Sequence, residues 1–131
     1  MIDIENDVFN YIATKVRKAY PNIYLSGDLN LNPAQFPCVY IEQADNFSLT
    51  TSRDSSSNEN HVSTMFEANV YSNKQVGRKS ECKAIMSIVD EAFSELGFTR
   101  QALLPLPYES YYRMVGRWSA IANKNKTIFR R

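Results

Sequence analysis

The sequence predicts an α+β fold, in which two helices pack on one face of a mainly antiparallel sheet. Two stretches, about residues 3–20 and within residues 73–98, repeat apolar residues at three- and four-residue steps, the period of an amphipathic helix. Other segments alternate apolar and polar residues, as strands with one buried face do. The predicted order is α-β-β-β-α-β-β, and 131 residues is the length of one domain, residues 1–131.

The first helix, about residues 3–20, has acidic residues in its first turn and basic residues in its last. Both sets oppose the helix dipole favourably. Pro21 ends the helix, because proline disfavours helical geometry in the residue before it. A short strand at 23–25 and a loop at 26–37 follow. The members of the apolar stripe are Ile4, Val8, Ile12, Val16 and Ala19.

The next two strands, 38–44 and 61–72, are expected to pair as an antiparallel hairpin with one buried face. The polar segment between them, about 46–61, exceeds the usual hairpin loop of about 2 to 5 residues. Serine, threonine and asparagine dominate it. Such a composition buries too little apolar surface to offset the entropy of ordering, so we expect a flexible loop that orders on contact with a neighbouring subunit.

The long second helix is the clearest element of the chain. Its apolar residues fall at steps of three, four and seven, and Gly97 follows where a left-handed residue ends a helix. A strand at 98–104, a strand at 110–123 and a short edge strand at 128–131 complete the sheet. The stripe consists of Cys82, Ile85, Met86, Val89, Ala92, Phe93 and Leu96.

Residue types argue against several kinds of site. His61 is the single histidine, and a base on a flexible loop is a poor partner for a nucleophile. Cys38 and Cys82 form no CxxC pair, so we expect no metal and no cofactor. A disulfide between them is possible, although a chain without an export signal favours free thiols. Because these residues match no catalytic pattern, we expect a protein that is not an enzyme. No apolar run is long enough to span a membrane, so we also expect no membrane contact.

The charges are divided along the chain. Residues 1–110 contain nine Lys or Arg and fourteen Asp or Glu, whereas residues 111–131 contain six basic residues and no acidic one. Such a division indicates contact with a polyanion, pairing with an acidic face of another subunit, or a solvated basic tail. Tyr111, Tyr112 and Trp118 interleave with arginines, as in strands that stack bases. However, alternation places Trp118 on the core side.

The chain resembles the tail terminator, or tail completion, proteins of long-tailed bacteriophages and prophages of Gram-positive bacteria. The resemblance covers about residue 36 to the end and is one of pattern and order. Its most telling parts are "IEQADN", "ENH", "ANVYSNK" leading into the second helix, "LGFTR", "YYRMVGRWSAI" and the closing "IFRR".

This resemblance implies a virion protein, assembled in the host bacterial cytoplasm, that forms a hexameric ring at the head-proximal end of the tail tube. Its partners would be itself, the tail tube protein, the head-closure or connector protein and, without sequence specificity, DNA passing through the lumen. Alternatives are a head-tail connector or minor capsid component, and a nucleic-acid-binding module that uses the basic C-terminal region. None of the candidate assembly contacts matches a family motif; they are Arg53, Asp54, Glu59, His61, Arg113, Arg117, Arg130 and Arg131.

We predict that deleting residues 50–58 leaves a folded monomer with nearly unchanged thermal stability and impairs assembly. Added loop length is inexpensive, at roughly 0.6 kcal/mol for each doubling, so its removal changes stability little. Thermal unfolding and a mass measurement of free and tube-bound protein test this. Unfolding of the shortened chain would contradict it.

Overall fold

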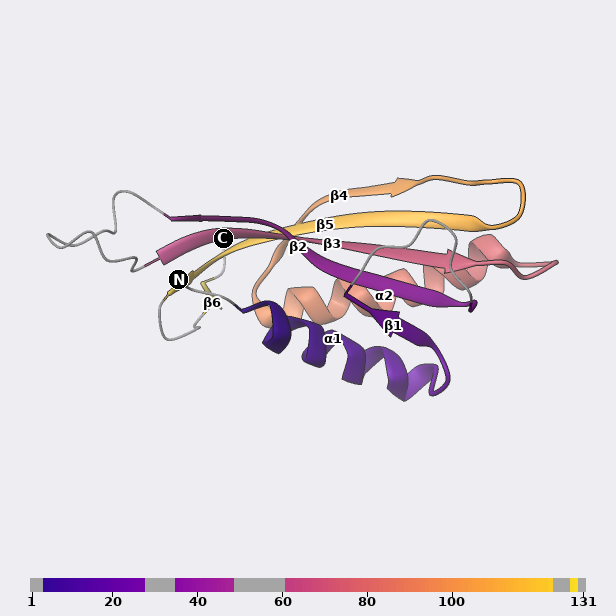
Figure 1. Ribbon diagram of the computed structural model, residues 1–131, viewed down its shortest axis with the longest axis horizontal. Helices are drawn as coiled ribbons and strands as arrows, with labels where there is room; N and C mark the ends of the chain where they lie inside the picture. Colours follow the sequence, from indigo (N-terminus) through magenta and orange to yellow (C-terminus); the bar gives the residue numbers. More distant parts are fainter. Residues whose placement is uncertain (1–3, 28–34, 49–60, 124–127, 130–131) are drawn as a thin grey trace, which may run out of the picture.

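The computed structural model describes residues 4–27, 35–48, 61–123 and 128–129 (Figure 1). The predicted α+β class and order of elements are confirmed, and a short last strand lies within the expected range 128–131. The helices and strands are α1 (Glu5–Ala19), β1 (Tyr24–Ser26), β2 (Cys38–Ser48), β3 (His61–Ser72), α2 (Arg78–Leu96), β4 (Thr99–Pro105), β5 (Tyr112–Asn123) and β6 (Ile128–Phe129).

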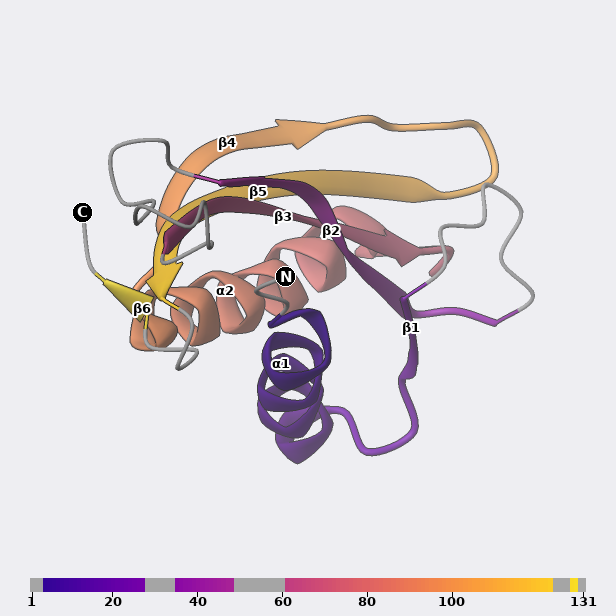
Figure 2. The same cartoon turned by 60° about the vertical axis from the view of Figure 1, so that its left-hand side comes forward.

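The strands form one sheet in the order β1-β2-β3-β5-β4, and β6 pairs with β5. β1 runs parallel to β2, and the other pairs are antiparallel. The predicted β2–β3 hairpin is confirmed. Both helices lie on the same face of the sheet, as Figures 1 and 2 show from two directions. The sheet therefore has one face covered by helices and one helix-free face.

The hydrophobic core lies between the two helices and the sheet. The predicted stripes of α1 and α2 pack there against Phe66, Met114 and Trp118, which project from the covered face of β3 and β5. Ala19 is the exception: at the last residue of α1 it is exposed, because the helix ends beyond the part that the sheet and α2 cover. The helices also contact each other through Glu95, which accepts a hydrogen bond from the Tyr11 hydroxyl at 2.9 Å and pairs with Lys15 at 3.3 Å. Exposed pairs of this kind contribute little to stability, so apolar burial holds the layers together.

The predicted loop at 46–61 is too long. Asn46, Phe47 and Ser48 continue β2, and His61 opens β3, with Ser48 opposite Val62 in the register. The hydrogen bonds between two backbones can continue without apolar alternation, so the polar composition did not indicate that these residues belong to the strands. The rest of that loop, residues 49–60, lies outside the described residues.

The prediction that β3 has a single buried face is also incomplete. Tyr71 is fully buried on the helix-free face, in a second cluster with Cys38, Tyr40 and Tyr111. Cys38 faces this cluster, whereas Cys82 lies in the main core, and both thiols are free. Burial raises the pKa of each thiol to about 12, so both stay protonated at neutral pH.

The two edges of the sheet differ. At β2, the backbone N–H of Gln43 donates to the Glu5 carboxylate at 2.9 Å, so the first turn of α1 occupies this part of the edge. At β4, the N–H of Leu106 donates to the carbonyl of Arg113 on β5 at 2.7 Å. Because antiparallel residues alternate between bonded and non-bonded pairs, Leu103 and Pro105 direct their backbone groups away from β5. Proline, which has no N–H, removes no ladder bond at such a position.

Trp118 of β5 connects α2 to the sheet through two contacts. Its indole stacks on Phe93 with ring centroids 4.4 Å apart, and its Nε1–H donates to the Asp90 carboxylate at 2.8 Å. The ring lies back over Gly116 of its own strand: a Cβ there would be 2.9 Å from Cζ3 of Trp118 and closer still to Cη2. Glycine at this position therefore provides the space that the indole fills.

We predict that Gly116→Ala lowers the free energy of unfolding by about 1–3 kcal/mol, because the new methyl group displaces a fully buried indole. Gly27→Ala is the matched control, since the nearest atom to its Cβ is 3.7 Å away, and we expect a change within about 0.5 kcal/mol. Denaturant unfolding of both variants measures the difference. Equal effects would show that Trp118 can move at little cost.

Candidate interaction surface

The helix-free face carries cross-strand rows of side chains set by the register. One row runs from Tyr24 through Cys38 and Tyr71 to Arg113, from β1 to β5. The next row runs through Ser26, Tyr40, Asn69, Val115 and Leu104, and therefore reaches β4. These rows combine buried aromatic and amide groups with exposed side chains at the two sides of the sheet.

Arg113 is the buried cation of this face, with 9% of its surface exposed. Its Nε–H and one terminal N–H donate to the Asn69 side-chain oxygen at 2.9 and 2.7 Å, and the other terminal nitrogen donates to the Tyr108 hydroxyl at 3.4 Å. The guanidinium also lies 5.5 Å from the centre of the Tyr71 ring. Neutral acceptors and an aromatic face therefore solvate this charge, so it acts as a structural group within the chain.

Arg117 lies four residues further along β5, on the same face, and is more accessible. Its Nε–H donates to the Glu67 carboxylate at 3.0 Å, and its side chain is 54% exposed. An exposed ion pair of this geometry contributes about 0–1 kcal/mol to stability. The guanidinium can consequently exchange Glu67 for an acidic group of another molecule at small cost.

Exposed apolar side chains lie at both sides of this face. Tyr24 on β1 is 41% exposed and Leu104 on β4 is 55% exposed. Leu106 and Tyr108 follow β4 with 39% and 47% exposure, and Tyr108 stacks on Tyr111 with centroids 4.7 Å apart. Concentration of large apolar groups on one face is typical of surfaces that contact other proteins.

The Tyr71 hydroxyl lies beneath this surface without a hydrogen-bond partner among the described residues. Burial raises the pKa of Tyr71 to about 12, an effect that the nearby Arg113 charge opposes. The pKa of Tyr40 is raised to about 12 for the same primary reason. These phenols therefore stay neutral across the physiological range and serve as packing groups rather than as acids.

The structure places two of the eight candidate contacts, Arg113 and Arg117, on the helix-free face. They are four residues apart on β5 and differ in burial. The backbone of His61 opens β3 opposite Asn123 of β5. The other five, Arg53, Asp54, Glu59, Arg130 and Arg131, lie outside the described residues.

The aromatic residues that interleave with these arginines do not form a base-stacking surface. Trp118 is fully buried on the covered face, as alternation predicted, and Tyr111 and Tyr112 are 7% and 9% exposed. Among the described residues, Tyr24 and Tyr108 are the exposed tyrosines of the helix-free face. Composition did not single them out, because their exposure depends on strand register.

The described part of the chain offers neither a cluster of metal ligands nor a membrane-spanning helix. No group of three or more His, Cys, Asp or Glu side chains is placed to hold a metal ion. Neither described helix is long and apolar enough to span a bilayer.

Comparison with known proteins adds little. No protein-family model and no curated protein matches the chain. Among the solved structures that match, one is similar over 89% of this chain and 94% of its own, with 11% sequence identity and a TM-score of 0.49. Nothing about function follows from a likeness at this level.

We predict that Arg113→Ala lowers the free energy of unfolding by about 1–3 kcal/mol, because it leaves the fully buried Asn69 oxygen without its donors. Arg117→Ala is the matched control on the same strand and face, with an expected cost of about 0–1 kcal/mol. Urea unfolding of the two variants tests the ranking. A larger loss for Arg117→Ala would contradict the assignment of Arg113 as the structural cation.

Proposed function

We propose that this chain is a structural assembly protein of a bacteriophage tail, a tail terminator that closes the head-proximal end of the tail tube. It would act as a homo-oligomeric ring, which the resemblance implies to be a hexamer, in contact with the tube protein and the head-closure protein. Such a protein acts by binding other copies of itself and neighbouring tail proteins, which requires interaction surfaces rather than a catalytic centre.

The observation that carries this proposal is a sheet covered by helices on one face, whose other face exposes Tyr24, Leu104, Leu106 and Tyr108. Solvent-facing sheet surfaces of monomers are mostly polar, whereas apolar groups gathered on one face favour contact with protein. Arg117 adds a cation whose intramolecular partner is easily exchanged. A protomer packed side by side in a ring would use such a surface.

The proposal also accounts for the division of charge along the chain. In a ring, each contact is heterologous, so a surface on one protomer meets a different surface on the next. Residues 1–110 carry a net negative charge and residues 111–131 a net positive one, so attraction between unlike charges of neighbouring protomers would favour such contacts. Like charges would oppose self-association through identical patches, which favours a closed ring over a two-fold dimer.

The test is deletion of the gene from the phage or prophage that encodes the chain, followed by electron microscopy of the particles. A tail terminator predicts abnormally long tubes that are not joined to heads, because tube polymerisation is no longer stopped. Expression of the unaltered chain from a plasmid, as the control, should restore tail length.

Two results would contradict the proposal. Tails of normal length that are detached from heads would favour the alternative role of head-tail connector. Normal infectious particles would exclude a tail function altogether.

A further inference from the structure

We propose that the outer edge of β4, together with the pocket beneath it, binds an extended segment of another protein, which carries an apolar side chain flanked by acidic ones. The segment would add a strand to the sheet beside β4. This inference rests on the geometry of β4 and α2 and does not depend on the proposed function.

The backbone of β4 offers hydrogen-bonding groups for such a strand. β4 is an edge strand that pairs with β5 alone among the described strands. The alternation fixed by the Leu106–Arg113 hydrogen bond directs the N–H and C=O of Leu103 and the C=O of Pro105 outward. Unpaired groups of this kind are the template for β-strand addition.

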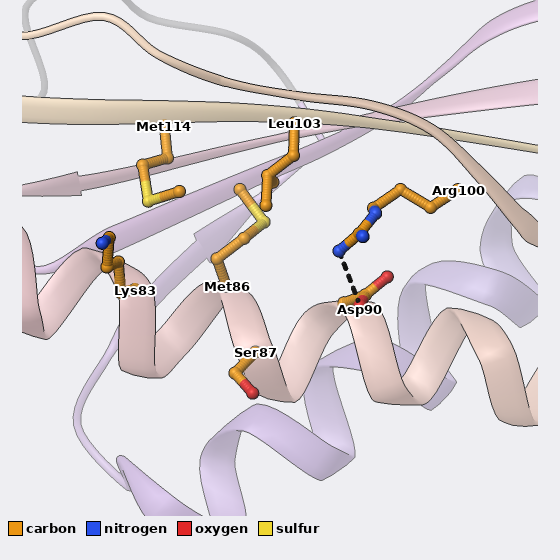
Figure 3. A pocket seen from close by; sticks show the side chains of 7 residues that line it. All are labelled: Lys83, Met86, Ser87, Asp90, Arg100, Leu103 and Met114. Atoms are coloured by element: carbon orange, nitrogen blue, oxygen red, sulfur yellow. Dashed lines mark hydrogen bonds and ion pairs between the residues drawn. The ribbon is translucent and has the colours of Figure 1, made fainter.

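A pocket opens between this strand and α2, on the covered side of the sheet (Figure 3). Leu103 of β4, Met114 of β5 and Met86 of α2 form its apolar part. Its volume is about 220 Å³, below the roughly 300–1,000 Å³ of sites for drug-sized ligands. This size suits one inserted side chain better than a cofactor, and methionine adapts its shape to different guests.

The polar rim of the pocket is mainly cationic. Figure 3 shows Lys83 near one end and Arg100 near the other, with Ser87 between them on the helix side. Asp90 accepts from Trp118 at 2.8 Å and from Arg100 at 3.2 Å, so Arg100 is paired as well, and the two cations and one carboxylate leave the rim with an excess of positive charge. Lys83 has no ion-pair partner among the described residues. The charge that complements this rim is negative.

These three features define the segment. Alternate residues of a strand project to the same side about 6.6–6.8 Å apart. An apolar residue that enters the pocket therefore places its second neighbours, before and after, toward the two ends where Lys83 and Arg100 lie. On the opposite side, the intervening residues would cover Leu104, which is 55% exposed. The preferred pattern is acidic–x–apolar–x–acidic.

The test uses a synthetic peptide with capped ends and the sequence threonine–aspartate–threonine–leucine–threonine–aspartate–threonine, titrated into the ¹⁵N-labelled full chain. We expect shifts of the backbone amides of Leu103 and Lys83 and slower hydrogen exchange of the Leu103 amide. A peptide with lysines in place of the aspartates should bind at least about tenfold more weakly, a change equal to about 1.4 kcal/mol.

Two substitutions on the exposed side of α2 separate the site from general electrostatics. Lys83→Glu should weaken binding of the aspartate peptide by about tenfold or more. Lys79→Glu, a change of another exposed lysine of α2 that lies outside the pocket, should weaken it less than about twofold. Leu103→Pro, which removes the outward N–H, should abolish binding while the β4–β5 pairing persists in the spectrum.

Several outcomes would overturn the proposal. These are absence of binding at about 1 mM peptide, amide shifts confined to other elements, equal affinity of the two peptides, and equal effects of the two lysine substitutions. Binding without slower exchange at Leu103 would also overturn it, because the pocket would then take an acidic amphiphile without strand addition. Normal particles from the gene deletion would refute the tail function and leave this test unaffected.

Discussion

The contact between Trp118 and α2 is the constraint on which the two-layer arrangement depends. The indole stacks on Phe93, donates to Asp90 and occupies the space above Gly116, so one side chain joins helix, strand and core. Aromatic pairs of this kind contribute about 0.5–1.5 kcal/mol beyond the area they bury. Because Asp90 also binds Arg100 of β4, the same contact reaches the edge of the sheet. The depth of the pocket beneath β4 therefore follows from how the core is packed.

Hydrophobic periodicity was sufficient to predict the two helices and the order of helices and strands along the chain. Both helices have apolar stripes several turns long, and Gly97 ends α2 with the expected left-handed conformation, φ 98°. Local pattern could not show that β5 inserts between β3 and β4, because that arrangement joins segments separated by the whole of α2. It also could not show that β1 runs parallel to β2, since three residues of alternation carry no direction.

The helix-free face was less predictable than the core, for a specific reason. Alternation correctly placed Arg113 and Arg117 on one side of β5, yet both look alike in sequence. The difference between them comes from their cross-strand neighbours: Tyr71 lies opposite Arg113 with Asn69 in the adjacent row, whereas Glu67 lies opposite Arg117. Register between strands more than 40 residues apart decides which cation is buried. That register cannot be predicted from the local pattern of a single sequence.

The end of β4 has a consequence for how long any partner would stay bound. Pro105 supplies no N–H, and the irregularity between Arg100 and Ala102 interrupts the ladder, so few backbone bonds are available there. A strip this short gives brief residence times, because dissociation breaks only a few bonds. Durable attachment would then require several copies held together, so that each lost contact reforms before the others open. Repetition, rather than tight individual binding, would make such an assembly permanent.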